Sequence, residues 1–222
     1  MILIIKQVVK IGGSLFPDYA IDLAEKLKST DSCIVLGGGE FANLIRKYND
    51  EQHFSEEVNH WTAIDCMDII AKLVNDKVES CKLAYSIDEV NQISDDGLTP
   101  IFVVSEFLRV EDPFECSWDV TSDSIAAYIA HLLNANLLIV TNVNGIYTQE
   151  PKEPGSTFIS KIDAKTLLTF PESSIDVMLP SLLLKFGTNC YVVNGKYPER
   201  VLSLIDDSIN DYNFDYTQIT GD

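Results

Sequence analysis

Two aspartates and an asparagine-rich turn stand close together in the segment from Ser117 to Pro151, which reads SWDVTSDSIAAYIAHLLNANLLIVTNVNGIYTQEP. Asp119 and Asp123 lie in a polar turn before an amphipathic helix, and an apolar strand then runs to Thr141 and the TNVNG turn. The carboxyl ends of parallel strands meet at one sheet edge, where α/β proteins build their ligand sites. The spacing therefore predicts a cluster of both aspartates and this turn at one sheet edge, as in an enzyme that handles a nucleotide.

A lysine and two glycines end the first apolar segment of the chain, in the string KIGGS. Gly12 and Gly13 would let a phosphate approach the backbone, and Lys10 would supply positive charge where phosphoryl oxygens gather. Ser14 completes the turn. The string is neither a P-loop nor a dinucleotide-binding GxGxxG. The alternative is a tight turn whose lysine extends along the strand to solvent.

Three consecutive glycines, Gly37, Gly38 and Gly39, separate a predicted strand from a predicted helix in the string VLGGGEFAN. Backbone N–H groups at such a junction gather at the positive end of the helix, which favours a bound anion. Each glycine costs backbone entropy and contributes no side chain. Three in a row therefore favour a functional role over a turn that serves packing alone.

The turn TNVNGIYTQEP follows a third apolar strand. Thr141 ends that strand, and Asn142 and Asn144 suit turn conformations. Gly145 accepts positive φ, and Tyr147 could either flank an adenine or pack at the edge of the sheet.

Helix capping is the alternative role for the polar residues that precede the helix expected at residues 122–134. Asp119 and Ser122 are the candidate caps. The segment contains more acids and hydroxyls than one cap requires, which favours further chemistry around Asp123.

The three histidines, His53, His60 and His131, have no ligand spacing with one another or with cysteines, so no metal site is predicted. His60 and Trp61 begin the long helix expected after the three glycines, where they could line an acceptor pocket or be half-buried packing residues. No Ser/His/Asp or Cys/His arrangement stands out.

Composition restricts the class of protein. The chain has 222 residues, 46% of them hydrophobic, and a formal net charge of −18, so a large core is expected and neither nucleic acid nor an anionic membrane is an expected partner. The start MILIIKQVVKIGG is interpreted as a buried strand rather than a signal peptide, and no apolar run is long enough to span a membrane. Five cysteines without CxxC spacing indicate reduced core residues in a cytoplasmic protein.

Apolar β-branched runs alternate with helical patterns, which predicts an α/β fold with a mostly parallel sheet covered on both faces. Strands are expected at residues 2–11, 32–36, 82–84, 101–104, 137–141 and 190–193. Helices are expected at residues 19–29, from about 41, and at 59–75, 122–134, 164–169, 179–186 and 199–204. Residues 112–116 mark the expected boundary between two lobes. Residues 206–222 contain five aspartates and neither lysine nor arginine, so a frayed or disordered acidic tail is expected.

Five strings resemble the amino acid kinase family in their order and spacing: VKIGGSL, VLGGGEFAN, TSDSIAAYIA, LLIVTNVNGIYTQEP and VMLP…VVNG. The family includes acetylglutamate, glutamate, uridylate and isopentenyl phosphate kinases. The resemblance covers residues 1–205 and implies one domain, a three-layer αβα sandwich with a mostly parallel central sheet. Residues 1–115 would bind the acceptor and residues 116–205 would bind ATP.

The resemblance also implies roles for individual residues. Lys10 would stabilise the transferring phosphoryl group, and Asp123 matches the family aspartate that positions the catalytic lysines. Gly37, Gly38 and Gly39 would hold the acceptor. The residues expected at the nucleotide are Gly12, Gly13, Ser14, Thr141, Asn142, Gly145 and Tyr147.

Two departures from the family pattern stand out. The family often reads TDVDG where this chain has asparagines, which removes two charges. Many members read GGMxPK where this chain reads DVMLPS, so the second family lysine is missing at Ser181. Lys185, one helical turn further on, is the expected catalytic replacement. The other possible suppliers are Lys161 and Lys165.

Within the family, the short length and the string SWDVTSDSIA are most similar to an archaeal and methylotroph branch linked to methanofuran biosynthesis. That branch uses ATP to convert [5-(aminomethyl)furan-3-yl]methyl phosphate into its diphosphate. Trp61, Trp118 and Asp119, with His60, would contact the acceptor. The resemblance implies ATP and Mg²⁺ as cofactors and a homo-oligomer. The alternatives are a UMP or isopentenyl phosphate kinase of the same fold and a non-catalytic nucleotide-binding sensor.

Overall fold

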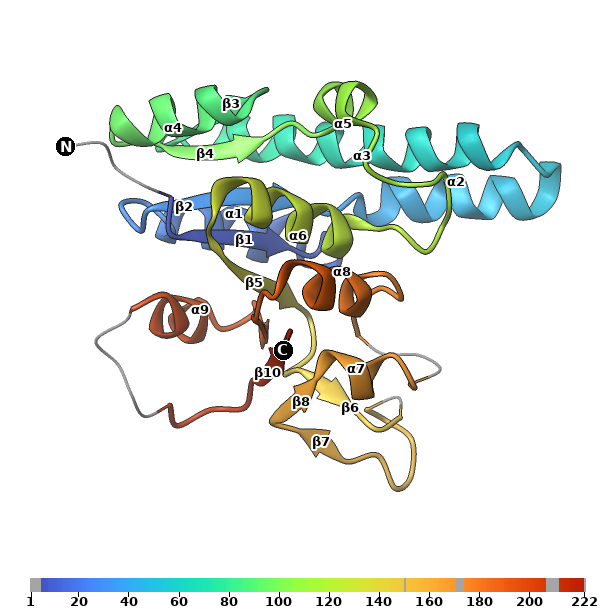
Figure 1. Ribbon diagram of the computed structural model, residues 1–222. Coiled ribbons are helices and arrows are strands. Elements are labelled where there is room, and N and C mark those ends of the chain that lie inside the picture. The colour runs from blue at the N-terminus through green and yellow to red at the C-terminus, as the bar shows by residue number, and fades with distance from the viewer. Residues whose placement is uncertain (1–4, 150, 171–173, 207–211, 222) are drawn as a thin grey trace.

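The computed structural model describes residues 5–149, 151–170, 174–206 and 212–221. Its strands are β1 (Gln7–Ile11), β2 (Ser32–Leu36), β3 (Cys81–Ala84), β4 (Thr99–Phe102), β5 (Asn136–Thr141), β6 (Ile146–Tyr147), β7 (Phe158–Ile159), β8 (Lys161–Asp163), β9 (Cys190–Asn194) and β10 (Thr217–Thr220). Eight of them form a central sheet in the order β3-β4-β2-β1-β5-β9-β10-β8, and β6 pairs with β7 separately (Figure 1). Neighbours in the central sheet are parallel, except that β9 and β10 are antiparallel.

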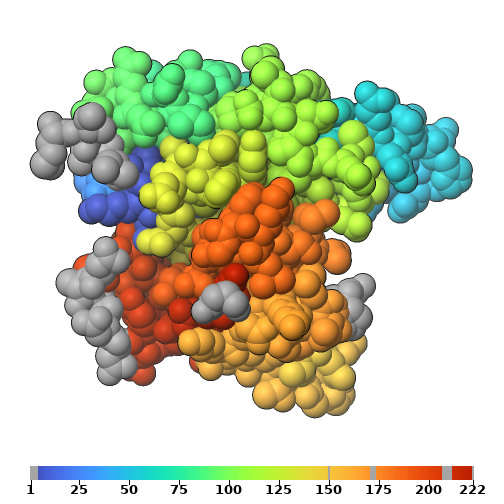
Figure 2. Space-filling view, viewed as in Figure 1, coloured from blue at the N-terminus to red at the C-terminus, as the bar shows by residue number. Residues whose placement is uncertain are grey.

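Helices cover both faces of the central sheet, which confirms the expected α/β sandwich. They are the 3₁₀ helix η1 (Gly13–Leu15), α1 (Asp18–Lys26), α2 (Gly39–Gln52), α3 (Glu56–Lys77), α4 (Ile87–Asp95), α5 (Ser105–Glu111), α6 (Ser122–Leu133), α7 (Ala164–Leu167), α8 (Leu179–Phe186) and α9 (Pro198–Ile205). One apolar core joins the sheet to α4, α5, α6, α7 and α8, and a second joins it to α1, α9 and part of α3. Figure 2 shows the first half of the chain (blue to green) gathered largely above the second half (yellow to red).

Strand β1 lies between β2 and β5, and all five of its residues are buried. Val8 belongs to the core that contains α6 and α8, whereas Val9 and Ile11 belong to the core beneath α1 and α9. Because side chains alternate along a strand, Lys10 faces the same side as Val8. Strand β1 therefore directs a lysine toward α6.

Helices α2 and α3 lie side by side and extend beyond the sheet at one end of the molecule, as the cyan projection in Figure 2 shows. Helix α2 begins at the third glycine of the GGG turn and buries none of its side chains. Helix α3 begins at the cap Ser55 and buries apolar residues from Ile64 to Val74 against both cores. The pair therefore anchors the glycine turn at the sheet edge while most of α2 stays exposed.

Most predicted elements are present with small shifts at their ends, and the segments predicted at 32–36 and 179–186 have the bounds of β2 and α8. Residues 2–4 of the first predicted strand lie outside the described residues. Helices α4 and α5 and the short strands β6, β7 and β8 were not predicted from the sequence. For α4 a signal existed, because Ser86 accepts the Glu89 N–H at 3.2 Å and Glu89 Oε2 accepts the Tyr85 N–H at 2.9 Å, in the manner of a capping box.

The prediction that residues 206–222 form a frayed or disordered tail is wrong for the described part of its end. Strand β10 lies inside the sheet between β9 and β8, and it buries Thr217 and Ile219 completely. Thr217 Oγ1 accepts the Ile146 N–H at 2.8 Å and donates to the carbonyl oxygen of Ile159. Residues 207–211 and 222 of the predicted tail lie outside the described residues. The acidic composition predicted disorder, but the burial of Thr217 and Ile219 stabilises β10 in the sheet despite the acidic residues around it.

The cysteines match the prediction of reduced core residues. All five are free, and the four that are buried are Cys33, Cys66, Cys81 and Cys190. Burial raises the pKa of the Cys81 thiol to about 12, and it raises the pKa of the Cys33 thiol further. These thiols therefore stay protonated and belong to the packing of the sheet.

Replacing Thr217 with valine keeps the side-chain shape but removes the hydroxyl that serves two backbone groups. The buried Ile146 N–H would lose its acceptor, so we expect the free energy of unfolding to fall by about 1–3 kcal/mol, as measured by urea titration. Thr220→Val is the matched control, since this half-buried hydroxyl of the same strand makes no hydrogen bond within the described part of the chain. Equal stabilities of the two variants would contradict the role assigned to Thr217.

Candidate active site

Lys10 and Asp123 form a buried ion pair at the centre of the molecule. Lys10 Nζ lies 2.7 Å from Asp123 Oδ1, and the two side chains are 10% and 6% exposed. Asp123 stands in the first turn of α6, which packs against β1. Either charge would be costly to bury alone, because neither would have a partner of opposite sign in a region of low dielectric constant. The structure thus brings together the lysine turn and the mid-chain aspartate, as the sequence analysis expects.

Helix α6 is capped by Thr121, whose Oγ1 accepts the Asp123 N–H at 3.5 Å. The prediction that Asp119 or Ser122 caps this helix is therefore wrong. Asp119 is exposed and its N–H donates to Ser117 Oγ at 3.0 Å, whereas Ser122 is the first residue of the helix itself.

Asp176, which the sequence analysis read only as part of the string DVMLPS, links the N-termini of α6 and α8. Its carboxylate accepts hydrogen bonds from the N–H and hydroxyl groups of both Thr121 and Ser124, at 2.6 to 3.0 Å. It also accepts the Leu179 N–H at 2.7 Å, and its own N–H donates to Asp123 Oδ2 at 3.1 Å. Burial raises the pKa of Asp176, and the Asp123 charge raises it further, while the bonds from Ser124 and Thr121 oppose the rise.

The two glycine turns pack backbone against backbone. A Cβ on Gly13 would lie 2.1 Å from the nitrogen of Gly39, and a Cβ on Gly37 would lie 2.7 Å from the nitrogen of Gly13. No side chain tolerates such separations, so these glycines are required for packing. The packing role was the alternative in the sequence analysis, and contact with phosphate or acceptor stays a prediction.

Two glycine N–H groups predicted at ligands are already occupied. The Gly12 N–H donates to the carbonyl oxygen of Val140 at 2.8 Å, and the Gly37 N–H donates to the carbonyl oxygen of Ile11 at 2.9 Å. The expectation that Gly12 gives its N–H to an ATP phosphate is therefore corrected: this N–H holds β1 to β5. Ser14 follows in η1 with an exposed side chain at the same sheet edge.

The predicted nucleotide turn lies beside the end of β9. The Thr141 carbonyl oxygen accepts the Gly195 N–H at 2.8 Å. Asn194 Nδ2 donates to Asn144 Oδ1 at 3.0 Å and to the carbonyl oxygen of Asn142 at 3.4 Å. Asn144, which stands where the family often has an aspartate, therefore holds the turn through a neutral amide hydrogen bond, and Asn142 contributes its backbone carbonyl oxygen.

Gly145 and Tyr147 continue this turn into the small β6–β7 sheet. A Cβ on Gly145 would lie 2.3 Å from Thr217 Oγ1, so β10 supports the turn from within the sheet. The Tyr147 ring packs edge-on against Phe158, with centroids 5.4 Å apart. Edge packing of Tyr147 was one of the two expected roles, and contact with adenine stays a prediction.

A cavity of about 70 Å³ lies beside the glycine turn, between α2, α3 and the N-terminus of α6. Its lining is mostly apolar and consists of Gly38, Ala42, Arg46, Ala63, Ile64, Met67, Trp118, Val120, Thr121, Ser122 and Ile125. The Arg46 guanidinium lies 4.8 Å from the centroid of the Trp118 ring and supplies positive charge at this lining. Trp118, whose contact with an acceptor stays a prediction, lines this cavity together with Arg46, which stands mid-helix without a motif and was not singled out from the sequence.

His60, Trp61 and Asp119 do not line this cavity, and their contact with an acceptor stays a prediction. His60 is buried, and its Nδ1 lies 3.2 Å from the carbonyl oxygen of Ser117. The Arg109 guanidinium lies over the Trp61 ring, 4.8 Å from the centroid of that ring. His60 therefore supports the segment that leads to the cavity, and Trp61 packs outside it.

The structure does not bring Lys185 to the buried ion pair. Helix α8 begins beside Asp176 and ends beside the C-terminal half of α6, where Phe186 stacks on His131 with ring centroids 4.1 Å apart. Lys185 Nζ lies 5.6 Å from the centroid of the Phe186 ring. The prediction that Lys185 replaces the family lysine at Ser181 is therefore unsupported, because the extra helical turn carries it away from the site. Lys161 and Lys165 are exposed on β8 and α7.

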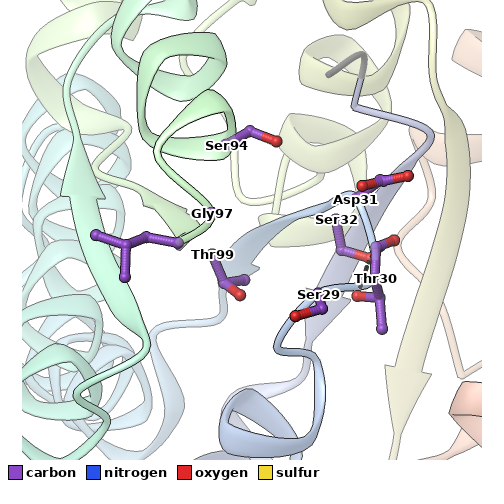
Figure 3. A pocket seen from close by; sticks show the side chains of 8 residues that line it. Ser29, Thr30, Asp31, Ser32, Ser94, Gly97 and Thr99 are labelled. Carbon is purple, nitrogen blue, oxygen red and sulfur yellow. Dashed lines mark hydrogen bonds between the residues drawn. The ribbon is translucent and has the colours of Figure 1, made fainter. Parts of the chain in front are cut away.

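A second cavity, of about 230 Å³, lies at the opposite edge of the sheet, at the amino ends of β2 and β4 (Figure 3). It is lined by Ser29, Thr30, Asp31, Ser32, Ser94, Gly97, Leu98 and Thr99. Thr30 Oγ1 donates to Ser32 Oγ at 2.8 Å across its floor. Because Lys10 lies near the carboxyl end of β1, the length of the sheet separates this cavity from the buried ion pair.

The described residues, 5–149, 151–170, 174–206 and 212–221, contain neither a metal-binding cluster nor a helix that could span a membrane. Within these ranges, no group of three or more His, Cys, Asp or Glu side chains is arranged to hold a metal ion. None of the helices seen in the described ranges combines the length and apolar character that a membrane crossing requires.

Comparison with known proteins matches residues 6–194 to the amino acid kinase family. The [5-(aminomethyl)furan-3-yl]methyl phosphate kinase of Methanocaldococcus jannaschii is 36% identical over 221 residues, which cover 97% of this chain and 98% of the relative. The uridylate kinase of the same organism is 26% identical over 211 residues and 87% of each chain. Among solved structures, the uridylate kinase of Archaeoglobus fulgidus superposes with a TM-score of 0.71 at 20% identity, covering 97% of this chain and 100% of that one.

Replacing Gly13 with alanine places a methyl group against the backbone of the GGG turn. We expect a loss of about 3 kcal/mol or more in the free energy of unfolding, because backbone atoms cannot move aside as a flexible side chain would. Gly97→Ala is the control: its Cβ meets open space, and its positive φ alone should cost about 1–2 kcal/mol. Urea unfolding of both variants measures the difference in stability. A smaller loss of stability in Gly13→Ala than in Gly97→Ala would refute the close backbone contact between the two glycine turns.

Proposed function

The chain belongs to the amino acid kinase family and is a small-molecule kinase, and we propose that it transfers the terminal phosphoryl group of ATP to the phosphate of a small acceptor. An acceptor phosphate oxygen attacks the γ-phosphorus while the bond to ADP breaks, so the acceptor becomes a diphosphate. We propose [5-(aminomethyl)furan-3-yl]methyl phosphate as that acceptor. The 36% identity to the M. jannaschii furan phosphate kinase over nearly the whole chain is the observation that carries this choice.

The buried ion pair supports the chemistry. Phosphoryl transfer needs charge neutralisation and in-line placement more than a covalent nucleophile. The Lys10 ammonium would stabilise the charge on the transferring group, and Asp123 would hold that ammonium in place. Lys10 comes from a central strand of the sheet and Asp123 from a helix packed on that strand, so their positions are fixed before a substrate arrives.

The cavity beside the GGG turn supports an acceptor that combines a small ring with a phosphate. Trp118 and the apolar side chains of Ile64 and Met67 offer surfaces for a ring. Arg46, at the same lining, offers a planar cation of the kind that binds phosphate. The lower identity to the uridylate kinase of the same organism agrees with a furan acceptor, although the shared fold keeps UMP as the second candidate.

Mg²⁺ fits this site as the counter-ion of ATP rather than as a resident ion. The carboxylate oxygens of Asp176 already accept five hydrogen bonds, and those of Asp123 face Lys10 and the Asp176 N–H. Mg²⁺ is commonly bound through phosphate oxygens and few protein ligands, and it neutralises phosphate charge. We therefore propose ATP and Mg²⁺ as the cofactors.

Ser181 favours one alternative of a different class. It stands in the first turn of α8, where many family members have a lysine, so a nucleotide-binding sensor without turnover is the alternative. Tight ATP binding without acceptor-dependent ADP release would favour that sensor.

We also propose that the protein is cytoplasmic, as its cysteine usage indicates, and that it is a homo-oligomer, as the family resemblance implies. The exposed side chains of Phe41, Leu44 and Tyr48 share one face of α2 and support an interface between copies. Light scattering after size-exclusion chromatography measures the assembly.

A coupled ADP-release assay tests the acceptor. We expect turnover with [5-(aminomethyl)furan-3-yl]methyl phosphate and a lower kcat/KM with UMP and with isopentenyl phosphate, because the chain is 36% identical to a furan phosphate kinase over nearly its whole length. Preferred turnover of UMP would reassign the substrate while leaving the kinase assignment intact. Absence of turnover with all three, together with measurable ATP binding, would instead support the sensor.

Replacing Lys10 with methionine keeps the length of the side chain but removes its charge. We expect kcat to fall by roughly 10²-fold or more, since one charge-stabilising contact to the transition state is lost. Lys82→Met is the matched control, because Lys82 is exposed on the edge strand β3. Circular dichroism establishes that both variants are folded, and a near-normal rate for Lys10→Met would remove Lys10 from the mechanism.

A further inference from the structure

Asp176 is a buried carboxylate whose hydrogen-bonding capacity is filled by the protein. Its two oxygens accept five hydrogen bonds, two from Thr121, two from Ser124 and one from Leu179. An ionised carboxylate offers about four lone-pair sites, so none is left for a substrate or a metal ion. Asp176 therefore acts on other residues rather than on a ligand.

The backbone of Asp176 touches the buried ion pair directly. Each carboxylate oxygen of Asp123 has a different partner. Oδ1 lies 2.7 Å from Lys10 Nζ, and Oδ2 accepts the Asp176 N–H at 3.1 Å. The carboxylate of Asp176 meanwhile accepts hydrogen bonds from Thr121, the N-cap two residues before Asp123, and from Ser124, the residue directly after Asp123. Backbone and side chain of Asp176 thus fix both the rotamer of Asp123 and the helix end that carries it.

The segment that carries Asp176 also reaches the predicted nucleotide turn. Ser174 Oγ donates to the carbonyl oxygen of Gly145 at 3.0 Å, two residues before Asp176. Residues 174–176 therefore span the distance between the turn after β5 and the first turn of α6. Three residues thus connect the Gly145 carbonyl oxygen to the Asp123 carboxylate through one hydrogen bond at each end.

We propose that Asp176 is a positioning residue for phosphoryl transfer, which holds Asp123 in the geometry that pairs with Lys10 and connects this pair to the nucleotide turn through Ser174. The role in transfer rests on the proposed function. The positioning itself rests on the hydrogen bonds alone and has a readout that does not require turnover.

A simple helix cap is the competing role, and the chain contains a matched control for it. Asp163 caps α7 by accepting the N–H and hydroxyl of Thr166, both at 2.7 Å, at an exposed position. Asp176→Asn and Asp163→Asn each convert a capping carboxylate to an amide. The difference between the two variants in kcat and in deuterium uptake therefore reports what Asp176 does beyond capping a helix.

Steady-state kinetics below the unfolding temperature of each variant provide the first test. We expect Asp176→Asn to lower kcat by roughly 10-fold or more with KM for ATP and acceptor close to wild type, as for other residues that orient a reacting group. Asp163→Asn should keep the wild-type kcat. Wild-type kcat in Asp176→Asn would overturn the proposal. If Asp176→Asn does not fold, Ser124→Ala, which removes one donor to the carboxylate, should lower kcat, and an unchanged rate would equally overturn it.

Coupling to Lys10 provides the second test. In a Lys10→Met background, Asp176→Asn should cause little further loss of kcat, because residues that act as a unit are not additive. If Asp176→Asn lowers kcat by the same factor in the wild-type and Lys10→Met backgrounds, Asp176 does not act through the ion pair.

Hydrogen exchange separates this proposal from the proposed function. Asp176→Asn should increase deuterium uptake in residues 7–14, which lie on the far side of Asp123, whereas Asp163→Asn should not. An enzyme inactive on every acceptor would refute the kinase reaction but could still show this increase. Unchanged uptake in Asp176→Asn would refute the positioning role whatever the activity.

Discussion

The buried ion pair between Lys10 and Asp123 is the constraint around which the site is built. A lysine inside an otherwise apolar central strand is tolerated only with a close partner of opposite charge, because an isolated buried charge is too costly. The partner comes from the N-terminal turn of α6, where the helix dipole favours a carboxylate. The Asp176 N–H stabilises the second oxygen of Asp123. Three segments distant in the sequence must therefore meet for this pair to exist.

The two glycine turns meet backbone to backbone close to this pair. Gly13 and Gly39 approach so closely that neither could carry a side chain, and Gly37 lies against Ser122 at the start of α6. The cavity that contains Arg46 and Trp118 adjoins the same turn. Phosphoryl transfer requires donor and acceptor at close range, and this packing shortens the path from the cavity to the lysine.

The turn after β5, where a nucleotide is predicted to bind, depends on β10 near the end of the chain. Strand β10 joins β9 to β8, and Thr217 satisfies the backbone of Ile146 while pressing on Gly145. The turn after β5 is thus held from inside the sheet by Thr217 and from the end of β9 by Asn194. Neutral amides replace the charges typical of the family there, which reduces the number of acids that the already acidic chain must accommodate.

The sequence by itself determined the alternation of strands and helices, and it singled out Lys10, Asp123, Trp118 and the glycine turns as candidate site residues, because periodicity and motif order are local properties. Only the tertiary structure decided how those parts are used. Asp176 carries no motif, since its role arises where the ends of α6 and α8 meet. The helical spacing of Lys185 was read correctly, but the direction of α8 takes it away from the ion pair. The acidic composition of the last residues predicted disorder, whereas pairing on both sides of β10 buries Thr217 and Ile219. Composition describes a segment in isolation, and the free energy of such a strand depends on its neighbours in the sheet.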